Sequence, residues 1–131
     1  MLIEMKDFGK DHWSTFAYAE TCCVDNRGGL DLVRLRINRG KRPIGGHPYG
    51  NPTWDPKYGT RIKDGSIPDT GHDDIDCLDD LERVGLLEWI GTLINPAVKL
   101  TDVGLKVVAQ LRQHKANGGQ FREFVPEMVY A

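Results

Sequence analysis

Residues 72–115 read HDDIDCLDDLERVGLLEWIGTLINPAVKLTDVGLKVVAQLRQHK, the stretch with the clearest pattern in the chain. Apolar residues recur every three or four positions over 73–85, which predicts a helix with one buried face. Two short apolar runs, 86–93 and 97–100, flank an Ile-Asn-Pro turn and predict a β-hairpin. Helical spacing returns over 101–115. The stretch therefore predicts a helix, a hairpin and a helix, an α+β arrangement.

Residues with strong helix-end preferences stand at these boundaries. Thr70 followed by Asp73 resembles a capping box, and acids in the next turn suit the positive end of the helix dipole. Gly85 stands where a C-terminal glycine cap is expected, and Thr101 stands where the last helix needs an N-cap. Ala-Asn-Gly-Gly at 116–119 is expected to end that helix. The capping signals and the apolar pattern predict the same elements.

The N-terminal part of the chain predicts another helix and then a strand. From Asp11 onward the apolar residues fall on one helical face, and the Asn-Arg-Gly-Gly breaker at 26–29 must end the helix. The residues of that face are Trp13, Phe16, Ala17, Glu20 and Val24. Residues 30–37 alternate in polarity, which predicts a half-buried strand with Arg34 and Arg36 on its outer face.

Residues 38–71 interrupt the regular pattern with seven glycines and five of the chain's seven prolines. Proline fixes φ and lacks a backbone donor, so a long helix is excluded from most of this segment. Inside it, the Asp-Gly pair of 60–67 is typical of a tight hairpin. So long a loop is either functional or disordered, and with Trp54 and Tyr58 as anchors we expect order. The 131 residues then form one domain with an irregular basic insertion at 38–71.

Residues 78–87, LDDLERVGLL, and 98–104, VKLTDVG, resemble two motifs of winged-helix regulators. The multiple-antibiotic-resistance and phenolic-acid-decarboxylase repressor families have a similar helix that leads into the wing, and a similar leucine-threonine start to the following helix. The resemblance covers roughly a third of the chain. It implies a modified winged-helix-like domain with the order helix, strand, long Gly/Pro loop, helix, β-hairpin, helix. Such domains regulate transcription and also serve in protein assembly.

Charge is divided between two segments, although the net formal charge is only −2. Residues 34–63 hold eight basic side chains and one acid, whereas 64–88 hold nine acids and one base. In winged-helix regulators the helix equivalent to 73–85 enters the DNA major groove, but its acids here would repel phosphates. This helix is therefore expected to face a protein partner or solvent. The acids assigned to that face are Asp73, Asp76, Asp79 and Asp80.

Nucleic-acid contact consequently falls to the basic segment. Lysine and arginine neutralise phosphates, and aromatic rings can stack on exposed bases. The alternative is a solvated basic face that balances the acidic helix within the same molecule. The candidate binding residues are Arg34, Arg36, Arg39, Lys41, Arg42, Trp54, Tyr58, Arg61 and Lys63.

The pattern around His72 offers the best candidate metal ligands. His72 and Asp76 lie four residues apart on the expected helix, as do Asp73 and Cys77, which allows two ligand pairs. The competing explanation is a helix N-terminus with acids placed on its dipole and a buried cysteine. His12 is a loose histidine that is expected in a solvated position. We therefore expect no catalytic residue, no metal and no cofactor.

Bulk properties bear on location and assembly. Three cysteines, two of them adjacent, do not make a disulfide framework. The sequence shows no secretory signal and no apolar run of the ~18 residues that cross a bilayer. We expect a cytoplasmic protein that does not contact membranes. The apolar residues of 120–131 are expected either to fold back on the domain or to join a second copy in a homodimer.

The sequence favours binding over catalysis. The first hypothesis is a non-enzymatic protein whose basic loop contacts a nucleic acid or a nucleoprotein complex. The alternative is a small phage or mobile-element inhibitor of a defence complex, of the anti-CRISPR kind. Its acidic helix would imitate nucleic-acid charge and occupy a basic groove on a protein partner. A weaker alternative is a metal-dependent enzyme centred on His72 and Asp76.

Overall fold

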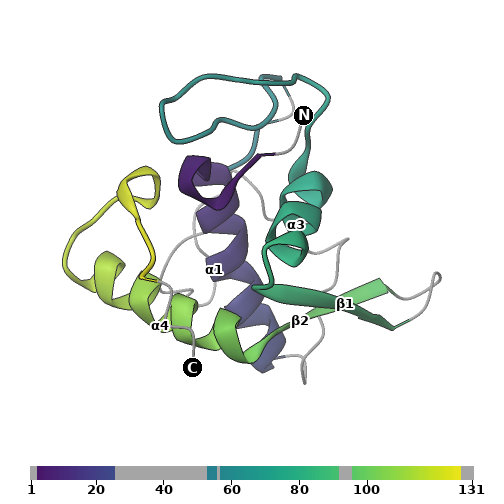
Figure 1. The fold of residues 1–131 in the computed structure, drawn as a ribbon, viewed down its shortest axis with the longest axis vertical. Helices are drawn as coiled ribbons and strands as arrows, with labels where there is room; N and C mark the ends of the chain where they lie inside the picture. Colours follow the sequence, from purple (N-terminus) through teal and green to yellow (C-terminus); the bar gives the residue numbers. More distant parts are fainter. Residues whose placement is uncertain (1–2, 26–52, 56, 92–95, 128–131) are drawn as a thin grey trace.

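The computed structural model describes residues 3–25, 53–55, 57–91 and 96–127 (Figure 1). The described part combines helices with a two-stranded antiparallel sheet, as expected for an α+β fold. Its elements are η1 (Met5–Asp7), α1 (Lys10–Asp25), α3 (Asp74–Arg83), β1 (Leu87–Gly91), β2 (Pro96–Leu100), α4 (Asp102–Ala116) and η2 (Phe121–Glu123). The strand predicted at 30–37 and the hairpin turn at 94–95 lie outside the described residues.

Helix α1 is the central element of the described fold. It packs against α3, β2, α4 and η2, which surround it in Figure 1. Trp13 and Phe16 are fully buried, so their predicted place in the core is confirmed. The prediction of a single buried face is too narrow, because residues 11–19 are all buried. A helix enclosed by neighbours on all sides loses the one-sided pattern on which the prediction relied.

Helix α3 begins later than its first sequence signal. Asp73 is the N-cap: its side chain accepts from the backbone N–H of Asp76 at 2.9 Å, and the Asp76 carboxylate accepts from the N–H of Asp73 at 2.9 Å. This reciprocal pair is a capping box, so the predicted pair of Thr70 and Asp73 was placed three residues too early. The end of the helix is as predicted. Gly85 follows it with φ at +85°, a conformation that favours glycine.

The hairpin and helix α4 form where the sequence predicts them. Leu87 pairs with Leu100 across the antiparallel strands. Thr101 caps α4, and its side chain accepts from the N–H of Gly104 at 2.9 Å. A Cβ built on Gly104 would lie 1.8 Å from the backbone oxygen of Leu86. The glycine of the leucine-threonine motif therefore lets α4 lie directly against the start of β1. The buried side chains of α4 are Val107, Val108 and Leu111.

The described end of the long Gly/Pro segment is an ordered loop. Trp54 anchors it, since the ring is 8% exposed and its N–H donates to the backbone oxygen of His72 at 3.3 Å. At the Asp-Gly pair the chain makes a tight turn, closed by a bond from Ile62 N–H to Ser66 O at 3.0 Å. Residues 60–67 contain no strand, so the predicted hairpin is reduced to this turn.

The C-terminal residues fold back on the core as far as they are described. Phe121 and Phe124 are buried, and the Phe124 ring meets Trp13 edge-on at 4.9 Å between ring centroids. The first of the two predicted alternatives is thus confirmed for these residues, while Val125 remains 69% exposed. Among the described helices, none combines the length and apolar character needed to cross a bilayer.

Candidate functional site

Asp11 fixes the loop beside the first turn of α1. Its carboxylate is 1% exposed and accepts from Lys10 Nζ at 2.9 Å, from Thr53 Oγ1 at 2.8 Å and from the backbone N–H of Arg61 at 2.7 Å. The two backbones meet closely here, because a Cβ on Gly9 would lie 2.6 Å from Arg61 O. Only glycine permits this approach. The N-terminus of α1 and the loop before α3 are thereby held together.

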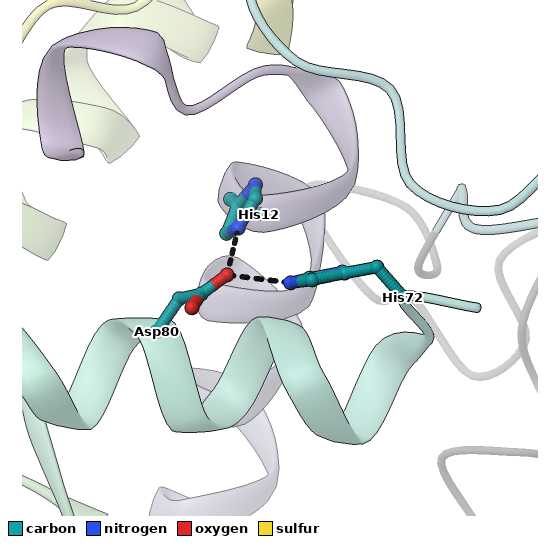
Figure 2. A group of neighbouring side chains, drawn as sticks. All are labelled: His12, His72 and Asp80. Atoms are coloured by element: carbon teal, nitrogen blue, oxygen red, sulfur yellow. Dashed lines mark hydrogen bonds and ion pairs between the residues drawn. The ribbon is translucent and has the colours of Figure 1, made fainter. Parts of the chain in front are cut away.

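Next to Asp11, three ionisable side chains converge. Asp80 Oδ2 lies 2.9 Å from His12 Nε2 and 2.7 Å from His72 Nε2 (Figure 2). His12 comes from α1, Asp80 from α3, and His72 from the loop just before α3. His12 is fully buried, while the side chains of His72 and Asp80 are 11% and 13% exposed. We call this group the His–Asp–His cluster.

The second ring nitrogen differs between the two histidines. His72 Nδ1 lies 2.6 Å from Thr60 Oγ1, whose hydroxyl is also placed to donate to the backbone oxygen of His72 at 3.0 Å. A hydroxyl has one proton, so this chain is consistent when His72 Nδ1 carries a proton and donates it to Thr60. His12 Nδ1 is buried without a hydrogen-bond partner among the described residues, and its ring stacks on Phe8 at 4.1 Å.

Burial and mutual contact set the charges of the cluster. Burial lowers the pKa of His12, and this effect outweighs the opposite effect of the hydrogen bond and charge of Asp80. His12 therefore stays neutral. Burial also disfavours charge on His72, but the hydrogen bond and charge of Asp80, with Asp76 and Asp73, outweigh it and raise the pKa of His72. Burial opposes ionisation of Asp80, yet its bonds and charges with both histidines lower the pKa of Asp80. Asp80 is thus a carboxylate that two imidazoles share.

This cluster replaces the ligand pairs predicted from the sequence. His72 pairs with Asp80 and not with Asp76, because His72 precedes the helix and Asp76 belongs to the capping box. Cys77 faces inward and is buried, and burial raises the pKa of its thiol, which makes it a poor nucleophile. His12 is not the solvated residue expected, since it lies in the core on α1.

Comparison with known proteins adds no family. No protein-family model, curated protein or solved structure matches this chain. The function must therefore be inferred from the residues and their contacts.

Only part of the predicted basic surface lies in the described residues. Trp54 is buried instead of lying open to stack on a base. Tyr58 is 41% exposed, with Arg61 Cζ 5.3 Å and Lys57 Nζ 5.4 Å from its ring centroid. Lys63 Nζ donates to the backbone oxygen of Phe124 at 3.1 Å, which is a structural contact within the protein. Outside the described residues lie Arg34, Arg36, Arg39, Lys41 and Arg42.

The acidic side chains at the start of α3 and along it make different contacts. Asp73 and Asp76 cap the helix, and Asp80 points into the protein instead of facing a partner. Asp79 is exposed and accepts from Trp89 Nε1 at 2.9 Å. Glu82 is exposed beside it and accepts from the backbone N–H of Trp89 at 3.1 Å. Of the predicted acidic surface, Asp79 remains as an outward-facing carboxylate, with Glu82 added to it.

Proposed function

We propose that this chain is a non-enzymatic binding protein on a winged-helix-like scaffold that contacts nucleic acid through its basic segment. The order α3, β1, β2, α4 supports the scaffold. The acids of α3 make this helix a poor reader of the DNA major groove, since phosphates repel them. The contact is therefore assigned to residues 34–63 and not to α3.

The exposed ring of Tyr58 carries this proposal. Lys57 and Arg61 both place a cation near the ring. Both residues lie outside α3 and its acidic side chains. Single-stranded nucleic acids bind where aromatic rings accept stacked bases and nearby cations meet the backbone phosphates. This cluster of Lys57, Tyr58 and Arg61 has both components at the end of a segment rich in basic residues.

Replacing Tyr58 with alanine is expected to weaken binding of single-stranded DNA or RNA by about 10-fold, because one stacked base is worth ~1–3 kcal/mol. Tyr58→Phe keeps the ring and should bind like the wild type. The measurement is fluorescence anisotropy with labelled oligonucleotides of both sugar types and a matched duplex. Equal affinities for wild type and Tyr58→Ala would remove Tyr58 from the interface.

The electrostatic part of the proposal has its own control. Lys57→Gln should lower the dependence of affinity on salt, whereas Lys106→Gln, at an exposed position on α4, should leave that dependence unchanged. Affinity is measured at two salt concentrations for each variant. Binding that is absent, or insensitive to salt, contradicts nucleic-acid recognition by this segment.

A second candidate is charge mimicry toward a protein with a basic groove. Burial is the main effect that raises the pKa of Asp79, and the nearby carboxylates of Asp76, Glu82 and Asp80 add to it. Asp79→Asn with Glu82→Gln keeps acceptors for both Trp89 N–H groups while removing two charges. We expect this variant to lose a pull-down partner that duplex DNA displaces from the wild type. Asp102→Asn, an exposed acid on α4, is the control. A partner that the neutralised variant retains contradicts mimicry.

A further inference from the structure

We propose that His12, His72 and Asp80 bind a divalent transition-metal ion, with Zn²⁺ as the expected occupant. This site goes beyond nucleic-acid binding and does not depend on it. Two imidazole nitrogens and a carboxylate oxygen are the donor set that Zn²⁺ takes in proteins. The three residues come from separate parts of the chain and meet only in the folded structure (Figure 2).

The donor atoms already converge on one place. His12 Nε2, His72 Nε2 and Asp80 Oδ2 all lie within 4.8 Å of one another. Zinc bonds of ~2.0–2.2 Å with tetrahedral angles separate neighbouring donors by about 3.3 Å. The contacts of 2.9 and 2.7 Å to Asp80 therefore need to lengthen by only about half an ångström to admit the ion.

The two imidazoles meet at one oxygen of Asp80, which brings the three donor atoms together. Both imidazoles point at Oδ2, while Oδ1 has Arg83 Nη2 at 3.4 Å. In Figure 2 both rings point at Oδ2 of Asp80, so an ion would bind once the two nitrogens turn from that oxygen toward a centre between the three donors.

Neighbouring groups are placed as outer-shell partners of a metal site. Ligating histidines usually donate their other ring N–H, which fixes the orientation of the ring. His72 meets this condition, because Nδ1 lies 2.6 Å from Thr60 Oγ1 and can keep its proton there, while Nε2 releases its proton to solvent when it binds the ion. Arg83 Nη2 lies 3.4 Å from the other oxygen of Asp80, Oδ1, and also donates to the backbone oxygen of Ile3.

The donor set and its burial indicate the kind of ion and its role. Imidazole favours Zn²⁺, Cu²⁺, Ni²⁺ and Fe²⁺ over Ca²⁺ and Mg²⁺, which prefer sites built from oxygen. Three protein ligands leave the fourth tetrahedral position to water. His12 is fully buried, and the other two side chains are nearly so. The ion would therefore join α1 to α3 and to the loop just before α3, with one coordination position left open to water.

The test uses the full chain without a histidine tag, made metal-free and then titrated with Zn²⁺ alone. We expect one ion per chain by calorimetry, with a rise in the melting temperature. His72→Gln and Asp80→Asn should each bind at least 100-fold more weakly. His114→Gln is the matched control, since His114 lies on α4 and contacts Gln120 O outside the cluster. Its affinity should equal that of the wild type.

A second measurement avoids dependence on the folding of variants. In the wild type, Zn²⁺ should shift the Nε2 resonances of His12 and His72 in ¹⁵N NMR spectra and leave those of His114 unchanged.

Thr60→Val should weaken binding by about 10-fold or more through loss of the outer-shell contact. The proposal is overturned if no stoichiometric binding occurs, if His72→Gln and Asp80→Asn bind like the wild type, or if other histidine resonances shift instead.

Discussion

Asp11→Ala should lower the free energy of unfolding by about 3 kcal/mol, because it removes a buried charge with several partners. The backbone N–H of Arg61 and the hydroxyl of Thr53 would lose their acceptor beside α1. The ammonium of Lys10 would lose its carboxylate partner at 2.9 Å. The loop that carries Tyr58 would then be released from the helix. Urea denaturation monitored by circular dichroism measures the change.

Two variants separate burial from charge. Asp11→Asn keeps one acceptor oxygen but places an amide against one of the donors, so we expect an intermediate loss. Glu4→Gln removes the acid of an exposed pair with Lys6 at 3.5 Å, which should change stability by less than about 0.5 kcal/mol. If Asp11→Ala were no more destabilising than Glu4→Gln, Asp11 would not hold the loop.

Gly104→Ala should destabilise the protein by about 2 kcal/mol or more, although alanine favours a helix over glycine by ~1 kcal/mol. The added methyl group would lie 1.8 Å from the backbone oxygen of Leu86. A backbone atom cannot rotate away, so α4 has to move from the start of β1. That movement would also strain the bond from Thr101 Oγ1 to Gly85 O. Thermal and urea denaturation give the change in unfolding free energy.

Gly71→Ala is the control for this substitution. Its Cβ would have one neighbour within 4 Å, the flexible carboxylate of Asp69 at 3.4 Å. Its stability should change by less than about 0.5 kcal/mol. A Gly104→Ala protein as stable as the wild type would mean that α4 and β1 can separate at little cost, which contradicts close packing between them.

The local parts of the fold could be predicted from the sequence because their signals lie within a few residues. Gly85 and Thr101 mark helix ends through their own conformational and capping preferences. The two short apolar runs on either side of the Ile-Asn-Pro turn predict the hairpin. The start of α3 was misplaced because Thr70 and Asp73 each precede an acid by three residues, and sequence spacing does not show which one forms the box.

The candidate site could not be predicted in the same way. His12 and Asp80 lie 68 residues apart, and only the packing of α1 against α3 brings them together. The His72 prediction failed because it assumed that His72 stands on the helix. An available signal was the sequence Asp11-His12 next to the core residue Trp13, since polar residues inside a buried helix need partners. The pattern does not name those partners.

The contact between Trp13 and Phe124 bears on how the protein is made. Both rings belong to one core, yet they come from opposite ends of the described chain. During synthesis, α1 is made and emerges well before Phe124 is added. The face of Trp13 that Phe124 covers stays exposed until the segment around Phe124 has been made. Folding is therefore completed after translation of that segment, and chaperones have an apolar surface to protect until then.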